Sequence, residues 1–395
     1  MTATPAVDAP ASIGGPSPVD HRGSWVPNGR MIATRFMELR KRRGLMIALI
    51  LVTIGIPTVF LVIRLLLHAF APKTYGPAGG YDIFTALVPG VLYVFGFIVA
   101  AALGCTAGTV DLTEGMFRHL VVTGRSRLAL YLARIPAGLA IILPLVAIGF
   151  TVVCAVCVFA APTQLSYQNV TVPAGLSHSA FDTWAGDHAD EVLCGIGYRF
   201  TGNGPSPEMN AVFNSVCGNG PGGPGFKVAP GGVTTPVASP AEIRATAITV
   251  ADQNYTDYSH HFLSPSNSLM IKTGLWIELE ATVGFVVGLG LGSLLGQRTV
   301  AVIIMVILEL VLTPIVSRAH LAHLINLQRS VVGLAVDHLE PSALGFVFGG
   351  GGGPGGGNGT SQLVPETTGQ AVLVIALWLV VWTAIGAWRM MTRDA

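Results

Sequence analysis

Apolar residues gather along the chain in a few long stretches rather than being spread evenly through it. Each stretch holds about 20 or more residues, the length of helix that crosses a hydrocarbon core of roughly 30 Å. Lipid offers no hydrogen-bond partner to the backbone, so each stretch is expected to be an α-helix that satisfies its own peptide groups. The sequence predicts six such spans, at approximately residues 45–70, 84–106, 131–161, 271–296, 299–317 and 371–391.

Composition and charge narrow the fold class. Hydrophobic residues make up 51% of the 395-residue chain and charged residues 11%, against about 25% charged residues in an ordinary soluble domain. This balance excludes a soluble enzyme. The net charge of +1 gives no reason to expect a nucleic-acid partner. We therefore predict an all-α polytopic protein of the cell membrane, with six transmembrane helices and the lipid bilayer as its surroundings.

The distribution of Lys and Arg predicts the orientation of the spans. Basic residues are frequent before the first span and between the second and third, whereas the long segment between the third and fourth spans holds only Arg199, Lys227 and Arg244. Cytoplasmic loops near span ends carry the excess of basic residues. Both termini are therefore expected to be cytoplasmic, and the long segment extracytoplasmic.

That long segment, residues 162–268, contains two cysteines, Cys194 and Cys217. An oxidising compartment and an even number allow a disulfide between them, and the sequence leaves the pair open between bridged and free. Gly and Pro are frequent at residues 202–207 and 218–225, which predicts an irregular insertion. No metal site is expected, because no HExxH motif is present and the outer histidines, such as His320 and His323, do not supply three convergent ligands and a base.

The link between the second and third spans has the pattern of a short amphipathic helix. Glu114 and Arg118 stand at a favourable i, i+4 spacing, and Met116, Leu120 and Val121 form an apolar face. A helix of this kind would lie at the inner membrane surface. The alternative is a solvated loop that only anchors the topology by its charge.

The stretch from Tyr81 to Arg134 resembles the permease subunits of ABC-2 type exporters. In that family a Pro-Gly pair opens the second span, as Pro89-Gly90 does here, and a cytoplasmic acidic residue followed by Glu-Gly and Arg precedes the third. The matching positions are Asp111, Glu114, Gly115, Arg118, Leu120, Ser126 and Arg127. Gly124 departs from the pattern, because the family usually has Pro there.

The resemblance implies that residues 108–127 form a coupling helix that docks on a separate ATPase subunit. The residues implied in this docking are Asp111, Glu114, Gly115, Arg118, Arg125 and Arg127. It also implies export and a homodimer or pseudo-dimer of permeases. No Gly-X4-Gly-Lys-Ser/Thr loop is present to hold nucleotide phosphates. We therefore expect a transport subunit that is not itself an enzyme and has no cofactor, with ATP and Mg²⁺ bound by the partner ATPase.

Charged residues inside the predicted spans are the remaining functional candidates. Each costs about 2.5–3.5 kcal/mol at the bilayer centre by insertion measurements. Glu309 lies deep in the fifth span, and Glu278 and Glu280 lie in the outer half of the fourth. Arg64, near the outer end of the first span, is a candidate partner for one of the latter two. Structural pairing between helices and a substrate or gating role are both open for these residues.

The chain divides into seven expected regions. These are a disordered cytoplasmic tail at 1–29, an interfacial amphipathic helix at 30–43, spans one to three with the coupling helix at 44–161, the extracytoplasmic loop domain at 162–268, spans four and five at 269–318, an extracytoplasmic or re-entrant segment with a Gly-rich linker at 319–369, and span six with a cytoplasmic tail at 370–395.

Two other function classes compete with the permease. A non-transporting polytopic protein, such as a sensor or an assembly factor, would act through the loop at 162–268. A secondary transporter is disfavoured, because the two three-span halves show no evident inverted repeat.

Overall fold

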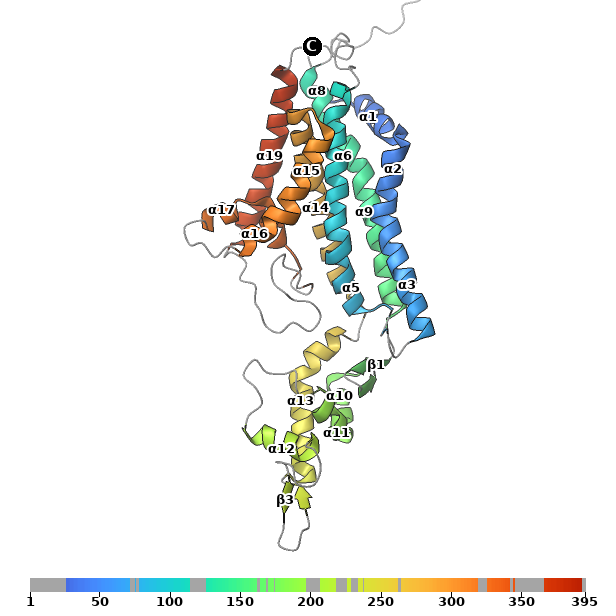
Figure 1. Cartoon of the computed structure of the whole chain (residues 1–395), viewed down its shortest axis with the longest axis vertical. Helices are drawn as coiled ribbons and strands as arrows, with labels where there is room; N and C mark the ends of the chain where they lie inside the picture. Colours follow the sequence, from blue (N-terminus) through green and yellow to red (C-terminus); the bar gives the residue numbers. More distant parts are fainter. Residues whose placement is uncertain are drawn as a thin grey trace, which may run out of the picture.

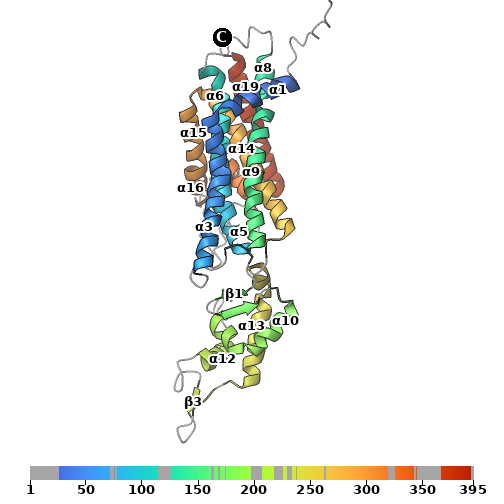
Figure 2. The same cartoon turned by 90° about the vertical axis from the view of Figure 1, so that its right-hand side faces the viewer.

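In a computed structural model, the chain forms a helical bundle with a smaller domain beyond one of its ends (Figure 1). The smaller domain is the insertion between the third and fourth spans, and we call it the insert domain. A view turned by 90° shows the same stacking of the two parts along one axis (Figure 2). The described residues are 26–71, 75, 78–113, 126–161, 164–167, 170–173, 175–196, 207–217, 226–228, 234–236, 238–261, 264–318, 325–341, 344 and 366–392.

All six predicted spans are confirmed as helices long and apolar enough to cross a membrane. In chain order they are built from α2 (Arg43–Ile50), η1 (Leu51–Gly55) and α3 (Ile56–Phe70); α5 (Tyr81–Leu87), η2 (Val88–Tyr93) and α6 (Val94–Thr113); α8 (Arg127–Leu132) and α9 (Arg134–Phe159); α14 (Asn267–Leu295); α15 (Arg298–Ile307), η5 (Leu308–Leu312) and α16 (Thr313–Arg318); and α19 (Thr368–Thr392). The elements labelled η are π-helical turns. An additional helix, α1 (Gly29–Lys41), precedes the first span.

The fourth and fifth spans form a tight hairpin. α14 ends at Leu295 and α15 begins at Arg298. Gly296 caps α14 in the left-handed conformation, with φ of +71°, which residues with a Cβ rarely adopt. The glycine therefore sets where the chain reverses.

The closest helix contact in the bundle joins α6 to α14. A Cβ at Gly288 would lie 2.7 Å from the carbonyl oxygen of Ala101, and one at Gly292 would lie 2.7 Å from that of Cys105. From the other side, a Cβ at Gly104 would lie 2.1 Å from the carbonyl oxygen of Phe285. The Gly288 and Gly292 pair thus serves close helix approach, and its partner is the second span. α14 is also the most buried of the six spans.

Three π-helical turns interrupt the spans beside prolines. Pro89 lies within η2, Pro57 follows η1 by two residues, and Pro314 follows η5 by two residues. Proline cannot donate a backbone hydrogen bond inside a helix, and a wider turn accommodates the loss. The hydroxyl of Thr313, the residue after η5, donates to the Leu308 carbonyl oxygen at 3.0 Å, so a side chain helps to satisfy the altered backbone.

Between the fifth and sixth spans two short helices, α17 (Ile325–Arg329) and α18 (Val332–Asp337), pack back against the bundle. Every residue of α18 is buried. Gln328 Nε2 donates to the Val316 carbonyl oxygen at 2.8 Å, and Trp378 Nε1 of α19 donates to the Ser330 carbonyl oxygen at 2.7 Å. These bonds hold the α17–α18 segment to both flanking spans.

The insert domain contains several helices and two small antiparallel sheets. Its elements are β1 (Gln164–Tyr167), β2 (Val170–Pro173), α10 (His178–Asp187), α11 (Ala189–Glu191), η3 (Val192–Ile196), α12 (Pro207–Cys217), β3 (Phe226–Val228), β4 (Thr234–Pro236) and α13 (Pro240–His261). β1 pairs with β2 and β3 with β4, with Gln164 opposite Pro173 and Phe226 opposite Pro236. The long helix α13 packs against α10, α11 and α12.

The described part of this domain has a core and a disulfide of its own. Phe181, Leu193, Phe213 and Val250 belong to a hydrophobic core separate from that of the bundle. A disulfide joins Cys194 to Cys217, with 5.4 Å between the Cα atoms, and ties η3 to α12. The Gly and Pro clusters that suggested irregularity fall mostly outside the described residues, so composition averaged over the whole insertion concealed the helices between them.

Candidate functional site

Three carboxylate side chains from three separate segments come together inside the bundle. Glu280 lies on α14, Glu309 in the π-helical turn η5, and Asp337 at the end of α18. Each is only 1% exposed. Glu280 is close enough to Glu309 and Asp337 for their charges to repel one another. We call these three residues the acidic cluster.

Aromatic residues of the second and fourth spans hold α18 beside these carboxylates. Tyr93 Oη, at the end of η2, donates to Asp337 Oδ1 at 2.8 Å. The Tyr93 ring stacks on Trp276 of α14, with ring centroids 4.5 Å apart and planes 9° apart. Trp276 Nε1 in turn donates to the Val336 carbonyl oxygen at 2.9 Å. The stacked pair therefore fixes the last turn of α18 through one side-chain and one backbone bond.

Close packing brings Glu309 against the same helix. A Cβ at Gly333 of α18 would lie 2.9 Å from Glu309 Oε2 and 2.7 Å from Thr313 Oγ1. Only a residue without a side chain leaves room for the carboxylate and the hydroxyl there. Gly333 is thus the position that lets α18 approach η5.

The acidic cluster has no compensating base within the described part of the chain. Neither carboxylate oxygen of Glu280 has a hydrogen-bond partner, and Asp337 Oδ2 also has none. Arg64 lies half-buried on α3, and neither Glu280 oxygen accepts a hydrogen bond from it. Burying carboxylates of like charge without a partner is strongly unfavourable. The arrangement is therefore suited to accept positive charge, in the form of protons or another cation.

Sequence reasoning found part of this site. It singled out Glu280 and Glu309, which the structure brings together, and Glu278, which is half-buried. Residues at positions i and i+2 of an α-helix lie about 200° apart around its axis. Glu278 and Glu280 therefore cannot face the same neighbour. Asp337 and Tyr93 were missed. The sequence signal for Asp337 was its place as a single acidic residue directly after an apolar run, Val332 to Val336.

A second feature lies at the end of the bundle that holds α1, opposite the insert domain (Figure 1). α6 extends to Thr113, so Asp111 lies in its last turn, and α8 begins at Arg127. Glu114, Gly115, Arg118 and Arg125, at the centre of the expected coupling helix, lie outside the described residues.

The residues that flank this link are tied to neighbouring spans. Arg127 Nη1 donates to the Met391 carbonyl oxygen at 3.1 Å, which joins α8 to the last turns of α19. Arg134 is buried, and its Nη1 donates to the Gly108 carbonyl oxygen of α6 at 3.4 Å. Both ends of the link are therefore anchored to the bundle.

Helix α1 adds a basic element at the same end. It ends at Lys41, and the non-helical backbone of Arg42 separates it from α2, so it does not continue the line of the first span (Figure 2). Arg35 Nη1 and Glu38 Oε2 form an ion pair at 2.7 Å. α1 also contacts α9, which places it against the third span.

Two features of the bundle therefore require a functional explanation: the acidic cluster, and the end at which α1, α8 and the last turns of α19 lie. Comparisons with protein-family models, with curated proteins and with solved structures found no match to this chain.

Proposed function

We propose that this chain is the membrane-spanning permease subunit of an ABC-2 type exporter. It would work as a dimer of permeases, with ATP and Mg²⁺ bound by separate ATPase subunits. The observation that carries the proposal is the common location of α1, both ends of the 111–127 link and the last turns of α19, at the end of the bundle away from the insert domain (Figure 1). A partner docked on this end would touch the link, α1 and the sixth span together.

The packing of the bundle offers a route by which movement of the link would reach the other spans. The link continues directly from α6, which ends at Thr113. α6 contacts α14 backbone to backbone at Gly104, Gly288 and Gly292, without intervening side chains that could adjust. A displacement of α6 by a docked ATPase would therefore also displace α14.

The acidic cluster lies beside the two helices, α6 and α14, that such a displacement would move. Tyr93, just before α6, donates to Asp337, and Trp276 and Glu280 lie on α14. A shift of α6 against η5 would change the distances between the carboxylates and thus their tendency to take up positive charge. In the proposed cycle the acidic cluster is a gating element between the second, fourth and fifth spans.

The docking proposal is tested by co-purification of the chain with the Walker-motif ATPase that we expect in a neighbouring reading frame. Reversing the charge of the link with Glu114→Arg should abolish the association, because the implied docking surface changes sign. The matched control is Glu191→Arg, the same substitution on exposed α11 of the insert domain. Equal ATPase recovery with Glu114→Arg and with the control would show that the link does not dock the ATPase.

The gating role is tested by Glu309→Gln in the assembled complex in liposomes. The neutral amide keeps the shape of the side chain but removes its capacity to exchange a proton, so the rate of ATP hydrolysis per complex should fall severalfold. Glu191→Gln is the control at an exposed position. Wild-type hydrolysis by Glu309→Gln at normal protein levels would leave the acidic cluster with a structural role only.

A second candidate function rests on the insert domain. Its own hydrophobic core and its disulfide show that it is a folded unit, as a non-transporting sensor or assembly factor would need. The two candidates differ in one measurement. A chain that purifies without any ATPase, together with the absence of an ATPase gene beside its own, would favour the second.

A further inference from the structure

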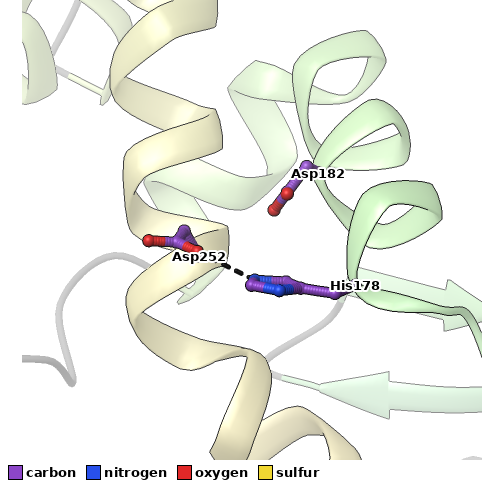
Figure 3. A group of neighbouring side chains, drawn as sticks. All are labelled: His178, Asp182 and Asp252. Atoms are coloured by element: carbon purple, nitrogen blue, oxygen red, sulfur yellow. Dashed lines mark ion pairs between the residues drawn. The ribbon is translucent and has the colours of Figure 1, made fainter.

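Three potential metal ligands of the insert domain point toward one another across the pair of helices α10 and α13 (Figure 3). His178 is the first residue of α10, Asp182 lies one turn further on the same face, and Asp252 lies on α13. His178 Nε2 is 2.8 Å from Asp252 Oδ1. The ligand atoms of all three residues lie within 4.8 Å of one another, and no other group of His, Cys, Asp and Glu among the described residues has this spacing.

The surrounding aromatic residues position His178 and the two helices that carry the three side chains. The His178 ring stacks on Tyr255 of α13 with centroids 4.3 Å apart, which restricts its rotation. The buried Phe181 stacks on Tyr258 with centroids 4.1 Å apart, which fixes α10 against α13. The site is therefore formed by two helices whose relative position the domain core already determines.

One ligand atom of this group has no partner within the protein. Asp182 Oδ1 is shielded from solvent and makes no hydrogen bond. In Figure 3 the Asp182 carboxylate points toward the other two side chains. A shielded carboxylate oxygen without a donor is unfavourable. A cation placed between the three residues would satisfy this oxygen together with His178 and Asp252.

We propose that His178, Asp182 and Asp252 bind a first-row transition-metal dication, and that Zn²⁺ is the ion they fit best. One imidazole nitrogen and two carboxylates form a mixed ligand set that suits Zn²⁺, whereas Ca²⁺ and Mg²⁺ prefer oxygen ligands alone. Three protein ligands leave a fourth tetrahedral position. The His178 and Asp252 side chains are 50% and 61% exposed, so this position faces solvent and is open to water or to an external ligand.

The observed spacing needs only a small adjustment to hold the ion. Zn–N and Zn–O bonds of about 2.0–2.2 Å at a tetrahedral angle place the two ligand atoms about 3.4 Å apart. The 2.8 Å separation of His178 Nε2 and Asp252 Oδ1 must then open by about 0.6 Å. Rotation of the exposed Asp252 side chain can supply this adjustment while the His178 ring stays stacked on Tyr255. The bound ion would join α10 to α13 at the surface, outside the hydrophobic core.

The test uses the full chain, purified in detergent with a tag free of histidine and stripped of metal with a chelator. Zn²⁺ is titrated by calorimetry, and Co²⁺ is added in parallel because its visible absorption reports the ligand geometry. His178→Ala and Asp252→Asn remove ligands at exposed positions, where they leave the fold intact. His188→Ala is the matched control, because it removes a histidine from the C-terminal end of the same helix.

We expect one strong Zn²⁺ site per chain in the wild type and in His188→Ala. The affinity should fall at least tenfold in His178→Ala and in Asp252→Asn, and the Co²⁺ band should disappear. Zinc bound equally well by His178→Ala is held elsewhere on the chain and would overturn the proposal. Failure of the wild type to bind either ion would overturn it as well, and would make the His178 and Asp252 contact an ordinary surface ion pair.

Discussion

The close contact of α6 and α14 predicts that a single added methyl group will destabilise the bundle. At Gly104 a Cβ would lie 2.1 Å from the Phe285 carbonyl oxygen, whereas ordinary van der Waals contact begins at 3.4 Å. Gly104→Ala therefore requires the helices to separate by about 1.3 Å, the difference between 3.4 and 2.1 Å. Overpacking of this kind costs about 1–3 kcal/mol, from which alanine's better helix propensity recovers up to about 1 kcal/mol.

The same helix offers the control. Gly96 of α6 has no atom within 4 Å of a Cβ built on it, so Gly96→Ala should be neutral or slightly stabilising. Thermal unfolding can be followed in detergent with a thiol-reactive dye, because Cys105 and Cys157 are buried and react only when the bundle opens. At one scan rate, we expect Gly104→Ala to unfold a few degrees below Gly96→Ala. Equal unfolding temperatures would refute the view that the two backbones are in contact.

Three further predictions concern the acidic cluster and the disulfide. The Tyr93 to Asp337 bond should give a coupling of about 1–3 kcal/mol in a double-mutant cycle of Tyr93→Phe and Asp337→Asn, measured by the same unfolding assay; additive effects would show that the bond is absent. Replacing Cys194 and Cys217 by serine opens a loop with a sequence separation of 23 residues, which is worth about 3.4 kcal/mol on the chain-entropy model. The double variant should then be cleaved by limited proteolysis between α10 and α13. A variant as resistant to the protease as the wild type would contradict this. Because Glu280 has no hydrogen-bond partner, Glu280→Gln should leave the unfolding temperature equal or higher, and a fall of several degrees would reveal a partner for the carboxylate.

The spans could be predicted from sequence because one physical requirement determines them. A helix that crosses lipid needs a continuous apolar run, and runs such as 131–161 have no competing interpretation. Basic residues also mark where several spans begin: Arg43, Arg127 and Arg298 are the first residues of three of them. Gly296 then fixes the hairpin between the fourth and fifth spans, because few other residues adopt its backbone conformation.

The acidic cluster could be predicted only in part, since a buried charge does not identify its neighbours. Glu280 and Glu309 are conspicuous within apolar runs, but Asp337 stands in a segment too short to be recognised as a buried helix. Its neighbour Tyr93 is 244 residues away in the chain. Contacts at that separation depend on how spans pack, and a single sequence carries no information on the choice of partner.

The helices of the insert domain had local signals that composition obscured. Ser239 and Glu242 form a capping box at the start of α13: the Ser239 N–H and hydroxyl donate to Glu242 Oε2 at 2.7 and 2.9 Å. These bonds lower the pKa of the Glu242 carboxyl. Ser177 caps α10, and its hydroxyl oxygen accepts a hydrogen bond from the Ala180 N–H. Such capping residues are local signals of helices within the segment.

The acidic cluster and the 111–127 link lie toward opposite ends of α6, which constrains how movement of the link could influence the cluster. α6 has 20 residues and is therefore about 30 Å long, with Tyr93 just before its first residue and the 111–127 link at its other end. A flexible contact along this length would absorb a movement of the link before it reached Asp337. In the half of α6 nearer the link, Gly104 and Gly108 instead pack directly against the backbone of α14. In the half nearer the acidic cluster, Phe97 packs against Gly284 of α14. Because α6 and α14 are in such close contact, they would move as one body. Relative motion should therefore occur between these two helices and η5, which carries Glu309.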